Sequence, residues 1–282
     1  MDIQIFSIPK SFSDPHISLI QRNALANWIA LCPGNPALIL GDDNGTAEAA
    51  KAAGARHIPG VQTNEYGTPR LDSAFRLAHE NSTASFLCYT NADILFPKRL
   101  LSIPHLMHQP ESCLVVGQRI DLQIDEEIRF DCPDWSVQLE NRARDDGSLH
   151  PAYGSDYFVF PREYYHSLPA FVVGRLGWDN WMITHAHEVG LHVVDASGYL
   201  LVLHQNHDYG HQVGSHNARG HDSAAPEARQ NCKLAGSRLF GLEGATNLLT
   251  ENGEMRHNKN PKRIIKQLWY DLCRLNRDKD IK

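Results

Sequence analysis

The first 95 residues alternate between short apolar runs and amphipathic segments, and this rhythm restricts the fold more than any other feature of the chain. Apolar runs typical of strands lie at 2–8, 37–40, 56–58 and 85–90. Helical patterns separate them. Asp14-Pro15 supplies an N-cap and a first-turn proline, Thr46 caps a second helix that Gly54 ends, and Thr68-Pro69 opens a third. This alternation predicts an α/β fold, with a mixed, mostly parallel sheet flanked by helices.

The later part of the chain is less regular. Strand patterns occur at 113–120, 124–130, 157–160, 191–194 and 199–203, and helical patterns at 133–144 and 178–189. Residues 206–260 are rich in Gly, His, Asn and Arg. For that stretch we expect loop and short helix.

Composition and missing motifs exclude several classes of protein. The net charge of −6 argues against a general nucleic-acid binder. No apolar run approaches the roughly 20 residues of a membrane span, and the N-terminus lacks the pattern of a signal peptide. We therefore expect a cytoplasmic protein. The fingerprints of dinucleotide-binding oxidoreductases, P-loop NTPases, serine hydrolases and zincins are absent, as is any Cys-x-x-Cys pair.

Polar residues follow two of the predicted strands. Asn91-Ala92-Asp93 comes directly after 85–90, and residues two apart in an extended segment face the same way. A carboxylate at this edge of an open α/β sheet suits a hard divalent cation that takes phosphate oxygens from a substrate. Asp42 and Asp43 follow the second strand and could accept hydrogen bonds from a ribose or a base. In both places an ordinary turn is the alternative.

Two later segments also carry candidate chemistry. Trp178 and Trp181 flank Asp179 at a predicted helix start, where aromatic faces suit sugar rings and a carboxylate can act as a general base. The alternative is an N-cap between core tryptophans. The histidines of 204–211 follow a strand, and neutral imidazole there is a good ligand for Mn, Fe or Zn. A polar loop is the alternative.

Taken together, these segments resemble the GT-A fold, a Rossmann-like fold of nucleotide-sugar-dependent glycosyltransferases, and in particular the bacterial family 2-like branch. The order of motifs matches: a metal motif ending in Asp93, the strand-to-arginine run 157–162, then Gly174, Gly177, Asp179 and Gly190. Two positions depart from the family pattern. Asn91 replaces the first acid of the metal motif, and Trp178 replaces the first acid of the usual Glu-Asp pair.

The resemblance implies a sugar transfer supported by Mn²⁺ or Mg²⁺. Asp93 would hold the ion, with His204 or His207 as a further ligand, and Asp179 would be the base of an inverting reaction. The implied nucleotide-sugar contacts are Ser7, Pro9, Lys10, Asp42, Asp43, Arg70, Asn91 and Asp93. The implied acceptor contacts are Asp156, Trp178 and Trp181. For Arg70 a solvated helix-end arginine is an equal alternative.

The same resemblance divides the chain. We expect a catalytic domain over 1–210, with a nucleotide-binding half at about 1–95 and an acceptor-binding half at about 96–210. Residues 211–282 would form a C-terminal loop and helical extension. Apolar residues recur there at helical spacing among basic ones over 262–277. This segment either packs on the domain or lies on the anionic inner face of a membrane, which would suit a lipid-linked glycan acceptor used in polysaccharide biosynthesis.

Two other functions stay open at this point. A metal-dependent hydrolase using His204–His211 would need further acidic or histidine ligands on neighbouring strand ends, and only Asp93 and Asp179 are obvious. A carbohydrate-binding protein could keep a transferase fold without catalysis. The sequence does not separate glycan from other hydroxyl acceptors.

Overall fold

The computed structural model describes residues 2–107, 112–207, 225–237, 239–268 and 270, and it confirms the mixed, mostly parallel α/β fold. Over these residues a nine-stranded sheet has the order β13-β12-β10-β6-β9-β4-β1-β2-β3. Its strands are β1 (Ile3–Ser7), β2 (Leu38–Leu40), β3 (Arg56–Ile58), β4 (Phe86–Thr90), β6 (Cys113–Val116), β9 (Tyr157–Pro161), β10 (His192–Asp195), β12 (Asn247–Leu249) and β13 (Met255–His257). Strand β9 runs antiparallel to β4 and β6, and β13 to β12, whereas the other neighbours pair in parallel.

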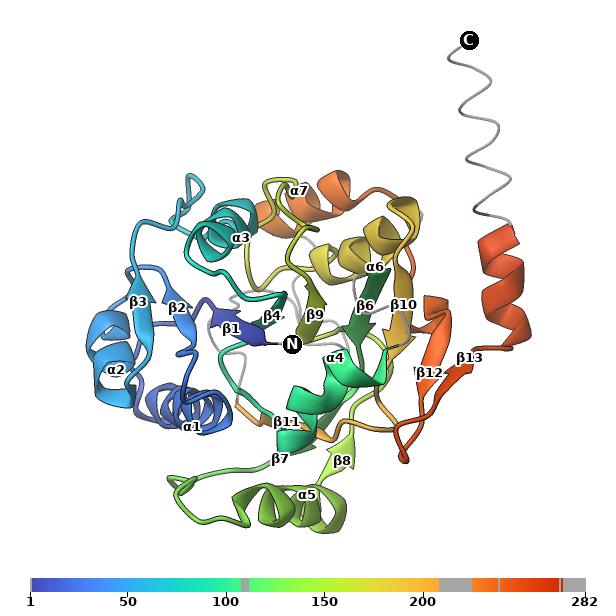
Figure 1. Cartoon of the computed structure of the whole chain (residues 1–282). Coiled ribbons are helices and arrows are strands. Elements are labelled where there is room, and N and C mark those ends of the chain that lie inside the picture. Colours follow the sequence, from blue (N-terminus) through green and yellow to red (C-terminus); the bar gives the residue numbers. More distant parts are fainter. Residues whose placement is uncertain (1, 108–111, 208–224, 238, 269, 271–282) are drawn as a thin grey trace.

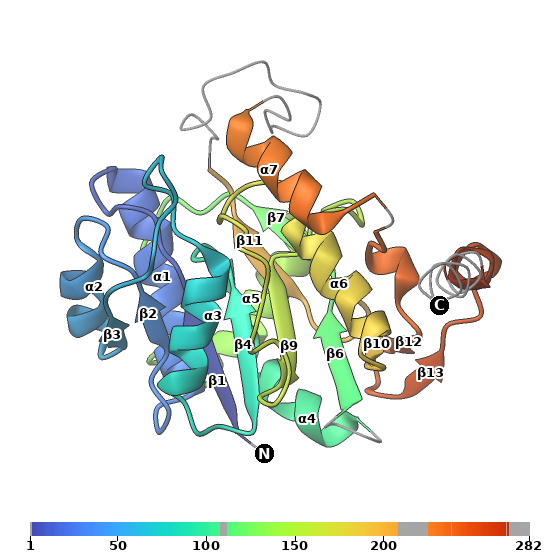
Figure 2. The ribbon, with the colours of Figure 1, turned by 90° about the horizontal axis from the view of Figure 1, so that it is seen from above.

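Helices cover both faces of this sheet (Figures 1 and 2). On one face lie α3 (Leu71–Glu80), α6 (Trp178–Glu188) and α7 (Pro226–Ala235). On the other lie α1 (Pro15–Leu31), α2 (Thr46–Ala53), the 3₁₀ turn Lys98–Ser102 and α4 (Ile103–Leu106). Each face has its own apolar cluster, and successive residues of β1 enter different clusters: Ile5 packs on the α1 side and Phe6 on the α3 side.

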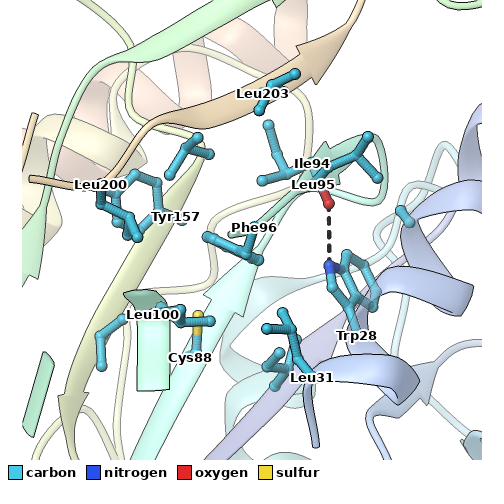
Figure 3. Packing of buried hydrophobic residues seen from close by; sticks show 14 of the residues in the cluster. Trp28, Leu31, Cys88, Ile94, Leu95, Phe96, Leu100, Tyr157, Leu200 and Leu203 are labelled. Carbon is cyan, nitrogen blue, oxygen red and sulfur yellow. Dashed lines mark hydrogen bonds between the residues drawn. The ribbon is translucent and has the colours of Figure 1, made fainter. Parts of the chain in front are cut away.

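A smaller sheet lies on the α1 side. Its order is β5-β11-β7-β8, formed by β5 (Ile94–Leu95), β11 (Val202–Gln205), β7 (Arg119–Leu122) and β8 (Ser148–Leu149), and α5 (Trp135–Asp146) packs beside it. Figure 3 shows how it is held: the Trp28 indole of α1 donates a hydrogen bond of 3.0 Å to the Ile94 carbonyl. Because β5 begins one residue after Asp93, this contact fixes the backbone beside a candidate ligand.

The structure corrects the expected run 113–120, which is two strands rather than one. Strand β6 ends before Gly117, where the chain leaves the large sheet, and β7 then joins the small one. A Cβ at Gly117 would stand 2.4 Å from the Tyr157 hydroxyl and 3.0 Å from the Ser197 nitrogen, so only glycine fits this crossing point. The expected strand at 124–130 is not present.

The C-terminal part also differs from expectation. Within 206–260, where we expected loop and short helix, β12 pairs with β10 and β13 pairs with β12, so the large sheet continues there. A 3₁₀ turn, Leu242–Gly244, leads into β12, and residues 261–268 are helical at the edge of the molecule beyond β13 (Figure 1). The domain boundary at residue 210 stays a prediction. In the described part of the chain, no helix combines the length and apolar character needed to cross a membrane.

Candidate metal centre and active site

A cavity of about 590 Å³ opens at one edge of the large sheet. The carboxyl ends of the parallel strands β1, β2 and β4 point to this edge, and the antiparallel strand β9 begins there, since Thr90 pairs with Tyr157. Of the residues singled out in the sequence, Pro9, Lys10, Asp43, Asn91, Asp93, Asp156, Trp178, Asp179, His204 and His207 line it. The volume is within the range of small-molecule sites.

Asp93, His204 and His207 bring three possible metal-ligand atoms together, all within 4.8 Å of one another. His207 Nε2 lies 3.1 Å from Asp93 Oδ2, and His204 Nε2 lies 3.8 Å from the same oxygen. An octahedral ion with bonds of about 2.1 Å separates adjacent ligand atoms by about 3.0 Å. Asp93 Oδ1 is buried without a hydrogen-bond partner among the described residues. The donor set therefore fits a divalent cation.

The small sheet sets this geometry. Strand β11 runs antiparallel to β5, which places His204 opposite Ile94, and the Gln205 amide donates to the Asp93 carbonyl at 3.1 Å. His207 follows two residues beyond the end of β11. The pairing of β5 with β11 thus brings together possible metal ligands that are more than a hundred residues apart in the chain.

Charge around Asp93 favours its ionised form. Burial raises the pKa of the Asp93 carboxyl, but His204 and His207 together outweigh that effect, and the net pKa is well below its ordinary value. An ionised carboxylate is the form that binds a cation.

A second carboxylate, Asp121, lies behind His204. Its Oδ1 is 3.1 Å from His204 Nδ1 and 2.8 Å from Arg119 Nε, and its Oδ2 is 2.7 Å from His150 Nδ1. Burial raises the pKa of Asp121, but His150, His204 and Arg119 reverse the effect and lower it strongly. Sequence reasoning missed these residues. Arg119 and Asp121 are two residues apart on strand β7, so their side chains lie on the same face. This spacing is the sequence feature that could have indicated a charged pair.

Asp156 and Asn91 form a neighbouring pair. Asn91 Nδ2 donates to Asp156 Oδ1 at 2.6 Å, and Arg119 Nη1 donates to Asp156 Oδ2 at 2.7 Å. Both oxygens of the carboxylate expected at the acceptor are therefore engaged by protein groups. Asn91 thus serves to hold this edge of the sheet as well as to line the cavity.

Asp179 lies in the first turn of α6, after Gly177, whose φ of 102° is in the left-handed region. Burial raises the pKa of the Asp179 carboxyl, and the charge of Asp156 adds to this. Backbone N–H groups, including those of Asn180 and Ser155, oppose the shift only in part. Asp179 is thus a partly buried carboxylate at the cavity wall.

The two tryptophans beside Asp179 differ. Trp178 lines the cavity, but it is only 6% exposed and packs against Tyr89 and Phe158, with ring centroids 5.2 and 5.5 Å away. Trp181 lies away from this cavity: it stacks on His185 at 4.5 Å and lines a separate, smaller pocket. The structure therefore does not bring Trp181 to the expected acceptor wall.

Three residues expected at the donor also lie off the cavity. Ser7 is fully buried and its hydroxyl donates to the Thr90 carbonyl at 2.6 Å. Asp42 accepts from the Gly60 amide at 2.7 Å, and Arg70 pairs with Asp72 at 2.5 Å. Each of these side chains is held by a hydrogen bond or ion pair outside the cavity.

Lys10, by contrast, is at the cavity, and its backbone is fixed by α1. The Lys10 amide donates to Gln21 Oε1 at 2.7 Å, and Gln21 Nε2 donates back to the Lys10 carbonyl at 2.9 Å. Other lining residues that the sequence did not indicate are Tyr66, Arg119, His150, Tyr153 and Arg175.

Comparison with known proteins gave results at the level of structure alone. Neither a model of a known protein family nor a curated protein sequence matched the chain. Solved structures did match. Glucosyl-3-phosphoglycerate synthase from Mycobacterium tuberculosis with phosphoglyceric acid is 17% identical, with a TM-score of 0.45 and 74% of each chain covered. The same enzyme with Mn²⁺, uridine diphosphate and phosphoglyceric acid is 16% identical, with a TM-score of 0.43 and 74% of this chain and 72% of that chain covered.

A more distant match is S. aureus TarS (residues 1–349) with UDP-GlcNAc. It is 11% identical, with a TM-score of 0.32 and 46% of this chain and 37% of that chain covered. The synthase is a GT-A glycosyltransferase, the class that the sequence motifs resemble. Similarity at TM-scores below 0.5 carries no argument about function, which has to come from the site.

Proposed function

We propose that this chain is a divalent-metal-dependent glycosyltransferase that moves a sugar from a nucleotide-diphosphate donor to a glycan or another hydroxyl acceptor. The observation that carries the proposal is the group Asp93, His204 and His207, in a cavity that Asp179 also lines. A cation site and a carboxylate with a raised pKa in one strand-end cavity are what metal-assisted transfer to a hydroxyl requires.

Each residue has a part in this proposal. Asp93, with His204 and His207, would hold Mn²⁺ or Mg²⁺, which as a Lewis acid stabilises the charge that develops on a departing diphosphate. Lys10 is at the same wall, where a cation favours phosphate. Asp43 and Pro9 would line the nucleoside, and Asp156 and Trp178 the side of the acceptor.

Asp179 is the proposed general base. In an inverting transfer one carboxylate takes the proton of the acceptor hydroxyl as the new bond forms. The raised pKa of Asp179 makes it a stronger base than an exposed aspartate.

The alternative of a metal-dependent hydrolase is less well supported. Among the described residues, the group that could hold a metal consists of one carboxylate and two histidines, and His211 of the expected cluster lies outside them. Sugar release that is independent of any acceptor would favour hydrolysis instead.

We further propose a cytoplasmic enzyme that touches an anionic membrane surface through its C-terminal helix, where a lipid-linked acceptor would lie. Support comes from Ile264, Ile265 and Leu268, which are 40%, 66% and 58% exposed within the helical residues 261–268. Of the longer segment expected at 262–277, Trp269, Leu272 and Leu275 lie outside the described residues.

The test is thermal unfolding with a panel of nucleotide sugars, with Mn²⁺ and with EDTA. A donor at about 100 times its Kd should raise Tm by roughly 5 °C in the presence of Mn²⁺ only. Asp93→Ala should lose this rise, whereas Asp125→Ala, which removes an exposed carboxylate beyond β7, should keep it. The donor that raises Tm is then used to measure transfer. A rise that survives EDTA, or that persists in Asp93→Ala, would contradict the metal site.

A further inference from the structure

We infer that Asp121 is a positioning residue for the metal centre: it fixes the ring of His204 so that Nε2 faces Asp93. The inference rests on the proposed function, because it gives the proposed ligand His204 a partner on its far side. The two nitrogens of the His204 ring face two different carboxylates. Nδ1 lies 3.1 Å from Asp121 Oδ1, and Nε2 lies 3.8 Å from Asp93 Oδ2.

Strand register makes this contact a property of the fold. In the small sheet β7 and β11 run in parallel, and the residue of β7 paired with His204 is Asp121. Side chains of paired residues stand on the same face of a sheet. No loop has to close for Asp121 to reach the ring.

In the described part of the chain, the buried ring of His204 has few hydrogen-bond partners within reach. Its side chain is only 5% exposed, and Nδ1 has no aligned hydrogen-bond partner among the described residues. A buried ring N–H needs an acceptor, and Asp121 Oδ1 is the carboxylate oxygen beside it. A proton on Nδ1 leaves the lone pair of Nε2 toward Asp93, which is the form that binds a cation.

Asp121 is itself held from two sides. Arg119, on the same strand, donates from Nε to Oδ1 at 2.8 Å, and His150, next to β8, approaches Oδ2 at 2.7 Å. Strand β8 pairs with β7, and Ser148 lies opposite Asp121. An acceptor fixed in this way orients its donor, and outer partners of metal-bound histidines typically contribute 10–100-fold to metal affinity.

A simpler role for Asp121 would be to balance the charge of Arg119. The two roles differ in a double-mutant cycle. A residue that acts through His204 has nothing to orient once His204 is removed. A residue that only balances charge weakens cation binding equally in both backgrounds.

The experiment measures the Kd of Mn²⁺ from the electron paramagnetic resonance signal of the free ion, on the full chain without nucleotide. Asp121→Asn should weaken binding by about 10–100-fold. In a His204→Ala background the same change should cost no more than about 2-fold. Asp125→Asn, which removes the same charge from an exposed position four residues on, should also stay within about 2-fold.

Equal losses in both backgrounds, or no loss, would overturn the role of Asp121 while leaving the metal site intact. Absence of Mn²⁺ binding by the unaltered chain would overturn the proposed function as well. Nitrogen NMR of the histidine rings in the unaltered protein, with diamagnetic Mg²⁺ bound, gives a second measurement that does not depend on how the variants fold. We expect the His204 proton on Nδ1, and a proton on Nε2 would overturn the inference.

Discussion

Asp179 combines a proposed catalytic task with an unfavourable place for a charge. We expect Asp179→Asn to lower turnover by at least about 10²-fold, because the amide keeps the shape but cannot accept the proton. In the unaltered enzyme the acid limb of the pH profile should lie above the ordinary carboxyl value of 3.8, since burial raises the pKa of Asp179. Steady-state rates measured across a range of pH give both the loss of turnover in the variant and the acid limb of the unaltered enzyme. Near-normal turnover of the variant would place the base elsewhere.

The same substitution should not cost stability. A carboxyl whose pKa is higher in the folded than in the unfolded state binds more protons when folded, so stability falls as pH rises through the folded pKa. At pH 7 the raised pKa of Asp179 therefore lowers the free energy of unfolding. We expect Asp179→Asn to unfold at the same or higher denaturant concentration at pH 7, with the difference fading as the pH falls below 3.8. A clear destabilisation at pH 7 would show that the carboxylate is needed for its backbone hydrogen bonds.

At the scale of single residues, the sequence predicted side chains whose place depends on strand ends. Asp93 and His204 were both expected after strands, but they meet through the pairing of β5 with β11 in the small sheet, which the sequence does not state. Trp181 and Arg70, which we expected at the acceptor and the donor, do not line the cavity. His185 and Asp72 engage them, and local spacing does not reveal such partners. Asp121 was missed because its role depends on pairing between β7 and β11, distant strands whose register the sequence does not state.

Helix α1 holds the segments that carry the proposed metal ligands through buried side-chain hydrogen bonds. Asn27 is fully buried, and its side chain donates to the Phe96 carbonyl at 3.0 Å and accepts from the Phe96 amide at 2.8 Å. Asn23 donates to the Gln205 side chain at 3.0 Å and accepts from the Ile128 amide at 2.9 Å. Buried side-chain amides of α1 therefore hold the segments that follow β5 and β7, and the end of β11.

Removing one of these amides should be costly. Asn27→Leu leaves the amide and carbonyl of Phe96 buried without partners, and each unsatisfied group costs about 1–3 kcal/mol. We expect the free energy of unfolding to fall by about 2–5 kcal/mol. Urea titration measures it. Arg22→Ala, at an exposed position of the same helix, should change stability by less than about 1 kcal/mol. If both variants lose equally little, the segment after Asp93 is held by packing alone.

Among elements, those within the regular alternation of the first 95 residues were predicted well, including the three-residue strands β2 and β3, and those after it less well. The first 95 residues contain capped helices such as α1, whose start at Asp14 and Pro15 is visible in the sequence. Strands β12 and β13 have three residues each, too few for periodicity to appear, and no regular alternation surrounds them. Their place is fixed by the pairing of β12 with β10 and of β13 with β12. The separation of β6 from β7 depends on contacts of Gly117 with Tyr157 and Ser197, which no local pattern encodes.

The molecule as a whole has an uneven charge and an unusually oriented C-terminal helix. Residues 256–282 contain nine Lys and Arg against three Asp and Glu, although the chain carries a net charge of −6. In the described part of the helix the polar side faces the body: Arg263 donates to the Asn258 carbonyl at 3.0 Å, Lys266 pairs with Glu243, and the Tyr270 hydroxyl bonds Glu188. The apolar side faces outward, the reverse of a helix that packs its stripe on a core.

An outward apolar stripe beside basic residues is the arrangement of helices that lie on anionic membrane surfaces. We expect the full chain to co-sediment with anionic vesicles at low salt and to be released by salt, because surface charge is screened within about 10 Å at 0.1 M. Replacing Ile265 and Leu268 by Ser should abolish sedimentation. Replacing the exposed Lys259 and Lys262 by Ser should weaken it by roughly 10-fold or more, at about 1 kcal/mol per basic residue.

The control for this prediction is a pair of equally exposed apolar residues elsewhere on the molecule. Val137 on α5 and Leu149 on β8 are 59% and 64% exposed. Helix α5 and strand β8 lie on the side of the molecule where the small sheet packs (Figure 1). Their replacement by Ser should leave sedimentation unchanged, since only the C-terminal stripe is flanked by the basic segment. Vesicle binding that falls equally in both pairs would indicate non-specific hydrophobic adsorption. If the full chain stays in the supernatant even at low salt, the outward stripe does not bind a membrane, and the acceptor need not be lipid-linked.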